Sequence, residues 1–88
     1  PDNYSLSQNY PNPFNPTTKI KFSLPENTSV KLRVFNILGK EVETLVNSRL
    51  NAGTYEVNFN ASKLSSGVYF YKLEAGSFTD IKKMVLVK

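Results

Sequence analysis

The segment Lys19-Ile20-Lys21-Phe22-Ser23-Leu24 alternates strictly between polar and apolar residues. Because successive side chains of an extended strand point to opposite faces, this period of two predicts a strand with one face in a core and the other in water. Two more segments repeat the alternation: Val30-Lys31-Leu32-Arg33-Val34 and Tyr55-Glu56-Val57-Asn58-Phe59-Asn60. No stretch shows a sustained period of 3.6 residues, so the chain is predicted to be all-β.

Three further segments are predicted strands with less regular patterns. In residues 40–46, Val42, Leu45 and Val46 break the alternation, which predicts a bulge or an early end of the strand. Residues 68–75 and 78–87 contain runs that are apolar on both faces, which favours central positions in a sheet for both strands. Turn-forming residues separate the strands at 25–28, 38–40, 48–53, 61–67 and 75–77.

These six strands, or seven if residues 4–8 pair at an edge, predict an antiparallel sandwich or a small barrel. The alternation also predicts which side chains face the core. The predicted inward-facing residues are Ile20, Phe22, Leu32, Val34, Tyr55, Val57, Phe59, Tyr69, Tyr71, Leu73, Met84 and Leu86.

All five prolines lie in the first 25 residues, at Pro1, Pro11, Pro13, Pro16 and Pro25. Proline lacks an N–H donor and biases its predecessor toward extended geometry, so residues 1–16 are predicted to form a proline-rich linker ahead of a sandwich domain at 17–88. Asn12 and Asn15 each precede a proline and are expected to close Asx-turns onto their own backbone. The chain does not start with Met, so we expect a piece of a longer polypeptide, with Lys88 as its natural end.

The composition argues against catalysis and metal binding. The 88 residues include no Cys, His or Trp, so the chain has no disulfide, no thiolate and no histidine base or metal ligand. The seven acidic residues are scattered over loops and outward strand positions. Glu41 and Glu43 share a strand face, but two carboxylates without further oxygen ligands make a weak cation site. We therefore predict no catalytic residues, no metal and no cofactor.

The charge balance raises the question of nucleic acid and membranes. The net charge of +4 permits weak attraction to nucleic acid or anionic lipid, and a basic sandwich with exposed aromatic rings would suit single strands. Residues 66–71 resemble the aromatic strand of an RNA-recognition motif but lack its leading basic residue and second glycine, so we interpret their tyrosines as core and predict no nucleic-acid binding. No apolar run approaches the about 18 residues of a transmembrane segment. The aromatic residues that could instead serve a polysaccharide-binding module are Tyr10, Phe14, Phe35 and Phe70.

Five sequence blocks, taken together and in order, resemble one family. They are LSQNYPNPFNPTTKI at 6–20, VFNILGKEV at 34–42, AGTY at 52–55, LSSGVYFY at 64–71 and KKMVLVK at 82–88. They are similar to the type A C-terminal sorting domain of type IX secretion, found at the ends of exported proteins in Bacteroidetes and relatives. The Asn-Pro-Phe-Asn-Pro block is more distantly similar to the immunoglobulin-like module of flagellar hook-capping proteins. The resemblance implies an immunoglobulin-like antiparallel β-sandwich of six to seven strands.

The resemblance also implies a function without catalysis. An upstream cargo domain in the same chain would cross the inner membrane by its own signal, this domain would fold in the periplasm, and the outer-membrane translocon would capture it. A sortase would then cut before the domain, with the region before Asn9 as the expected cutting site, and leave the cargo at the cell surface or outside the cell. The alternative is a non-catalytic accessory module of a secreted enzyme that binds polysaccharide or another protein.

We predict that partners read the address at the C-terminal strand, which is common to any cargo placed upstream. The residues of this predicted site are Lys82, Lys83, Val85, Val87 and Lys88, with Ser66, Gly67 and Val68 as a secondary contact. Met84 and Leu86 should point inward, and a charged, exposed final strand is also an edge with which another protein could pair. The competing interpretation is that this strand matters only because its removal unfolds the sandwich.

Overall fold

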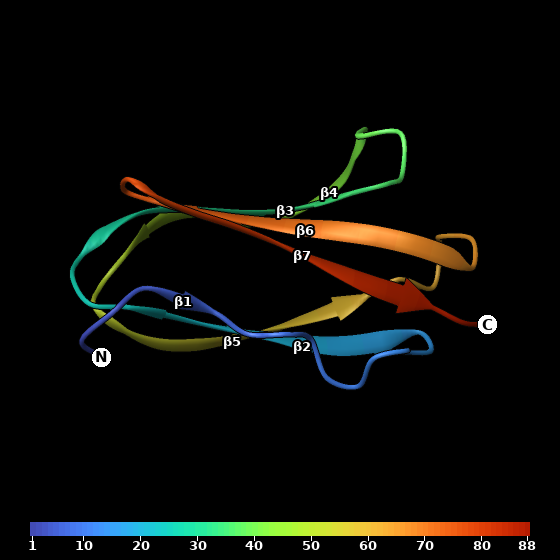
Figure 1. Ribbon diagram of the computed structural model, residues 1–88, viewed down its shortest axis with the longest axis horizontal. Coiled ribbons are helices and arrows are strands. Elements are labelled where there is room, and N and C mark those ends of the chain that lie inside the picture. The colour runs from blue at the N-terminus through green and yellow to red at the C-terminus, as the bar shows by residue number, and fades with distance from the viewer.

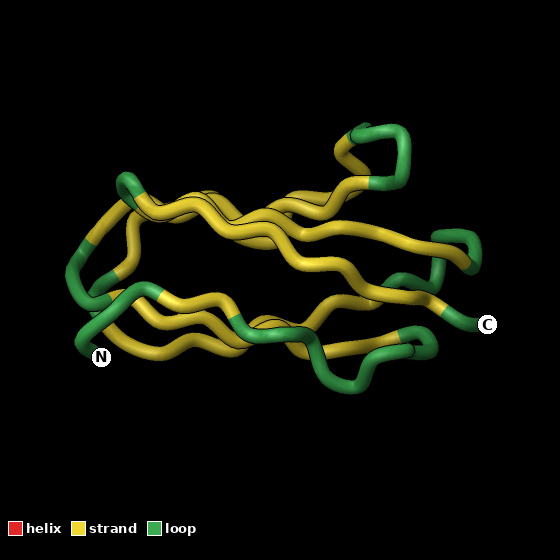
Figure 2. The backbone as a smooth tube through the Cα atoms, viewed as in Figure 1, coloured by secondary structure: helices red, strands yellow, loops and turns green.

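The computed structural model describes all 88 residues as two antiparallel sheets that face each other, and it contains no helix (Figures 1 and 2). The three-stranded sheet has the order β1 (Ser5–Leu6), β2 (Thr17–Leu24), β5 (Gly53–Asn60). The four-stranded sheet has the order β4 (Glu41–Leu50), β3 (Thr28–Phe35), β6 (Gly67–Ala75), β7 (Phe78–Leu86). The predicted antiparallel sandwich with a seventh strand at an edge is confirmed. No helix is therefore available to cross a membrane.

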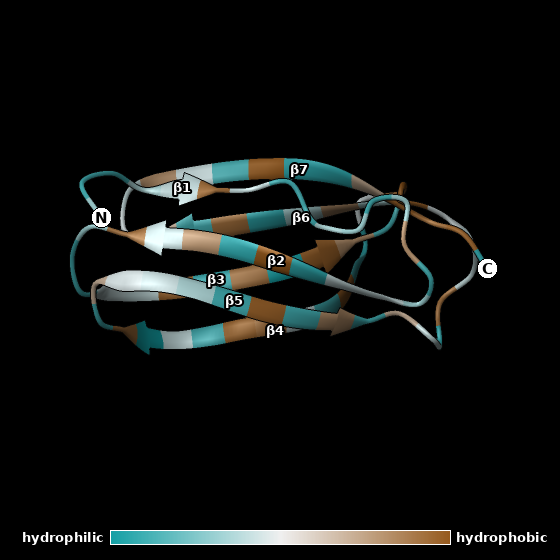
Figure 3. Ribbon diagram, turned by 90° about the horizontal axis from the view of Figure 1, so that it is seen from below, coloured by the Kyte–Doolittle hydropathy of each residue, from teal (hydrophilic) through white to brown (hydrophobic).

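The core lies between the sheets and follows the alternation. Along β2, every second side chain is buried, and Figure 3 shows the matching alternate teal and brown bands. All twelve residues predicted to face inward do so: ten are buried, while Tyr55 and Val57 are half-buried and pack against the core. Phe22 stacks on Tyr55 with ring centroids 5.5 Å apart. The burial of these side chains supplies the main driving force for folding.

Strand β4 carries the predicted irregularity but is longer than expected. Its pairing with β3 shifts register between Leu32 and Arg33 and again between Val34 and Phe35, which confirms the bulge. The ladder then continues to Leu50, so the break predicted at 48–53 shrinks to residues 51–52. The polar residues at 48–49 indicated a turn, but an edge strand tolerates polar side chains because one of its sides meets solvent.

The prediction that the last two strands are both central is right for β6 and wrong for β7. β6 lies between β3 and β7, whereas β7 is the outer strand of its sheet. The apolar residues on β7 are covered in part by residues that precede the sandwich strands. Phe14 is buried and forms an isolated parallel bridge with Leu86. Strand order is a long-range property, so the local pattern of β7 alone did not reveal it.

The proline-rich segment packs onto the sandwich. Tyr4 stacks on Phe78 with centroids 5.3 Å apart, Leu6 is buried, and the Tyr71 hydroxyl donates a hydrogen bond to the Ser7 carbonyl at 2.7 Å. Burial raises the pKa of Tyr71 to about 12, so this hydroxyl stays a donor at neutral pH. Residues 4–8, which include the region expected to be cut, are thus part of the folded structure.

The expected Asx-turn at Asn12 is not formed. Its side-chain oxygen accepts a hydrogen bond from the Val85 N–H at 3.0 Å, far along the chain, and Asn15 makes no side-chain hydrogen bond. Asx-type bonds occur instead at Asn36, which accepts from the Leu38 N–H, and at Asn60, which accepts from the Ser62 N–H. Asn12 therefore bonds to the edge of β7 in preference to its own backbone.

Candidate functional site

The two predicted contact regions form one surface at the C-terminal end of the sandwich. Gly67 pairs with Leu86 and Val68 with Val85 in the ladder between β6 and β7. The Lys88 N–H donates to the Ser66 hydroxyl at 3.0 Å. Lys83, Val87 and Lys88 are exposed, and Val85 is half-buried. Residues that the sequence predicted as separate primary and secondary contacts are thus direct neighbours.

Lys82 does not belong to this surface. It has the same parity on β7 as the buried Met84 and Leu86, so its side chain starts from the inner face of the sheet. Its ammonium group lies 3.9 Å from the Asp80 carboxylate at the sheet edge. Lys82 and Lys83 therefore present their charges on opposite sides of the strand, and the structure does not bring them together. Inward-pointing charges of this kind also discourage edge-to-edge association.

The outer edge of β7 is occupied along its C-terminal half. We define the edge cover as residues 8–14, which follow the strand from Lys83 to Val87. The Phe14 N–H donates to the Val85 carbonyl at 2.9 Å, and the Phe14 carbonyl accepts from the Val87 N–H at 3.0 Å. The Gln8 amide donates to the Lys83 carbonyl at 2.7 Å. A partner strand cannot pair with these groups while the edge cover is in place, which leaves the outward side chains of this part of β7 as its accessible surface.

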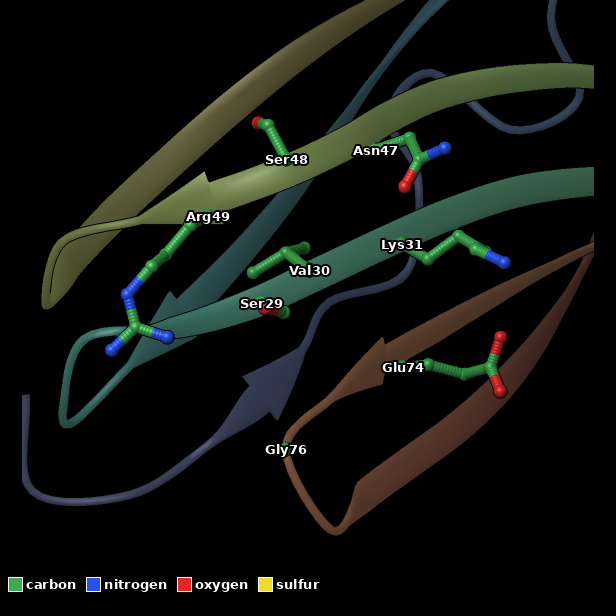
Figure 4. Close-up of a pocket in the computed structure, with 8 residues that line it drawn as sticks. All are labelled: Ser29, Val30, Lys31, Asn47, Ser48, Arg49, Glu74 and Gly76. Carbon is green, nitrogen blue, oxygen red and sulfur yellow. The ribbon is translucent and has the colours of Figure 1, made fainter.

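A polar groove of about 350 Å³ lies on the outer face of the four-stranded sheet (Figure 4). Its cationic residues are Lys31 and Arg49, but Figure 4 shows that these side chains extend toward opposite ends of the groove. Binding an anion would require them to converge. No group of three or more Asp or Glu residues lies close enough together to hold a metal ion.

The ionised groups next to this groove are bound to each other. The Arg33 guanidinium lies 2.5 Å from Glu74 and 3.3 Å from Glu41, and over the Phe35 ring at 5.2 Å. The hydrogen bond from Arg33 holds the pKa of Glu74 below its usual range. The Thr44 hydroxyl, followed by Arg33, lowers the pKa of Glu41. These carboxylates are ionised structural partners of an arginine, which suits neither acid nor base catalysis.

The four aromatic residues singled out from the sequence have different environments. Phe14 is buried, Phe35 and Phe70 are half-buried on the outer face, and Tyr10 is the one aromatic ring that is largely exposed. Phe35 and Phe70 are cross-strand neighbours in the ladder between β3 and β6. A row of several exposed rings, as a polysaccharide platform presents, is not formed.

Phe35 and Phe70 instead line an apolar groove that the sequence did not reveal. We define the apolar groove by Phe35, Ile37, Phe70 and Ile81, and its volume is about 380 Å³. Apolar residues at outward positions of three strands were the available signal. Their convergence depends on the strand order β3-β6-β7, which the sequence pattern does not contain.

The comparison with known families identifies the chain as a whole. Its sequence matches the secretion system C-terminal sorting domain over residues 8–88. The chain belongs to this family. This sorting domain is the C-terminal signal of the type IX secretion system, which exports its cargo to the cell surface or the extracellular space. The search of curated proteins found no match to this chain.

Proposed function

We propose that this sorting domain is the removable C-terminal address of a larger exported protein. It folds in the periplasm, the outer-membrane translocon captures it, and a sortase cuts it from the cargo. The domain itself performs no catalysis. The observation that carries this proposal is the placement of the chain ends at opposite ends of the sandwich (Figure 1). This placement separates a cargo joined near Pro1 from the surface formed by Ser66–Val68 and Lys83–Lys88.

Export of a reporter tests the proposal directly. Residues 1–88 are fused to the end of a reporter that carries its own inner-membrane signal, in a host with the type IX machinery. The reporter is expected on the cell surface or in the medium, and it should remain in the periplasm of a strain that lacks the translocon. Retention in the periplasm of both strains would overturn the proposed function.

The packing of the N-terminal residues restricts where the sortase cuts. Tyr4 and Leu6 contact the sandwich, whereas residues 1–3 are exposed. A protease needs an accessible, extended backbone, so we place the cut upstream of Tyr4 rather than between Tyr4 and Asn9. The mass of the released domain decides this, because a fragment that begins after Tyr4 would contradict the placement.

Charge reversal tests whether the secretion machinery recognises the C-terminal surface. We expect Lys83→Glu combined with Lys88→Glu to lower export of the reporter, since charged contacts mainly speed the encounter with a partner. Surface substitutions of this kind shift stability by only about 0.5 kcal/mol. The matched control is Lys21→Glu with Arg49→Glu, which changes the net charge equally at two exposed cations that form no ion pair. If the first variant melts and is exported like the parent, the electrostatic part of the proposal is wrong.

A further inference from the structure

Three of the five exposed large apolar side chains lie at or beside the apolar groove. Ile37, Leu38 and Ile81 are 70%, 86% and 55% exposed, and Ile37 and Ile81 line the groove together with Phe35 and Phe70. Monomeric proteins rarely leave contiguous apolar surface exposed without a use for it. None of these side chains contributes to the core cluster, so folding does not require them to be apolar.

The groove owes its shape to the bulges in β4. A bulge bends its strand, and the turn between β3 and β4 projects away from the sandwich on the side opposite the other sheet (Figures 1 and 2). The projecting turn contributes Ile37 and Gly39 to one wall, and the outer face contributes Phe70 and Ile81 to the other. The outer face thereby becomes concave at this end.

The projecting turn is held firmly. The Asn36 side-chain oxygen accepts hydrogen bonds from the N–H groups of Leu38 at 2.9 Å and Lys40 at 3.0 Å. The Asn36 N–H donates to the Lys40 carbonyl at 2.9 Å. Gly39 has a φ of +82°, which residues with a Cβ rarely adopt. Ile37 and Leu38 are therefore presented in a fixed geometry, which lowers the entropy lost when a partner binds.

The charges beside the groove are positive. Lys72 lines the groove, and Lys83 is the cross-strand neighbour of Phe70. Neither ammonium group has a carboxylate within 4.0 Å, whereas Glu41 and Glu74 are both bound to Arg33. A complementary surface carries carboxylates around an apolar centre.

We propose that the apolar groove and the Ile37–Leu38 tip dock a partner protein that inserts an apolar side chain flanked by acidic residues. The inference rests on the proposed function, and the partner belongs to the outer-membrane secretion machinery. The concave groove suits an inserted side chain, whereas a planar lipid surface would contact only the projecting Ile37–Leu38 tip and leave the groove empty. The surface continues to Lys83 on β7 and thus extends the predicted C-terminal contact across the outer face of β3 and β6.

The test is export of the reporter fused to residues 1–88 with Ile37→Ser and Ile81→Ser combined. Export is expected to fall about tenfold or more, as for an anchor residue at an interface. Tyr10→Ser removes an even more exposed apolar side chain, away from the groove, and should export like the parent. If the melting temperature of the double variant is lower than that of the parent, Leu38→Ser alone, at the most exposed position, replaces it in the export test. Ile37→Leu should retain export.

Two further measurements identify the occupant. A photo-crosslinking residue at position 37, but not at position 10, is expected to join the domain to an outer-membrane secretion protein with an acidic contact surface. In flotation with vesicles of phosphatidylethanolamine and phosphatidylglycerol, the domain should remain unbound. If it binds the vesicles and Ile37→Ser abolishes this binding, the occupant of the groove is lipid and the proposed protein partner is wrong.

The outcomes separate this proposal from the proposed function. If parent and groove variants are exported equally, the groove proposal is wrong and the sorting function stands. If the parent domain is not exported, both are wrong.

Discussion

The two outer faces of the sandwich obey the same alternation but expose different chemistry. On the three-stranded sheet, outward positions hold polar residues, and Lys19 pairs with Glu56 at 3.5 Å. On the four-stranded sheet, outward positions include Phe35, Phe70 and Ile81. Folding requires only that the inward set be apolar, so the outward set is free to differ. Apolar side chains at outward positions are thus a better pointer to function than any residue of the core.

The largest expected effect separates the inward phenylalanines from the outward ones. Phe22→Ala empties a fully buried position and should lower the free energy of unfolding by about 3–5 kcal/mol. Phe70→Ala, on the outer face, should cost about 1 kcal/mol. Urea denaturation of both variants measures the difference. Equal losses would mean that Phe70 is structural and that the two faces do not differ in the way described.

A smaller effect is expected at the boundary between the faces, where the edge cover meets β7. Asn12→Ala removes the acceptor of the Val85 N–H and should lower the free energy of unfolding by about 1 kcal/mol. It should also increase self-association, because an uncovered strand edge can pair with another chain. Asn15→Ala is the matched control and should do neither. Analytical ultracentrifugation and thermal melting check both results, and identical behaviour of the two variants would remove the role given to Asn12.

The pH dependence of stability tests the ion pairs on the outer face of the four-stranded sheet. The folded-state pKa values of Glu41 and Glu74 lie below their usual values, so their contribution is complete above about pH 5 and is lost as the pH falls through the folded pKa values. Melting temperatures should therefore decrease between pH 5 and pH 3, both approximate limits of carboxylate titration. Arg33→Gln should flatten this decrease, and an unchanged slope in that variant would exclude Arg33 as the cause.

No effect is expected from metal ions on either face. Since no three acidic residues come together, titration calorimetry with Zn²⁺, Ca²⁺ and Mg²⁺ should show no specific heat. A stoichiometric heat on either face would contradict this expectation. It would also show that a site had been built from fewer ligands than such ions normally require.

The sequence pattern predicted what depends on neighbouring residues. Alternation at Ile20, Phe22 and Leu24 is local, so strand identity and inward direction could be predicted. The broken parity near Val42 predicted a bulge or an early strand end for the same reason, and the structure has the bulge. The five sequence blocks identified the family because they share one order along nearly the whole chain.

What could not be predicted depends on which strands become neighbours. The edge position of β7, the cover formed by Phe14 and the contact of Val68 with Val85 all require the strand order. The apolar groove needed one further fact, the outward bend of the turn that carries Ile37. Prolines at 11, 13 and 16 indicated an extended segment, but not the surface on which it would lie.

The edge cover has a consequence for protein synthesis. Asn12 and Val85 are 73 positions apart, and the cover at 8–14 finds its partner strand only when residues 83–87 exist. A ribosome makes the cover early and its partner strand last among the seven. A polypeptide that stops short of β7 therefore leaves the cover without its partner strand and exposes the edge of β6 that β7 would pair with, while β6 keeps its pairing with β3. Such a product lacks the C-terminal strand of the sorting domain. The domain therefore reports complete translation, because only a cargo whose mRNA has been translated through β7 carries the whole export signal.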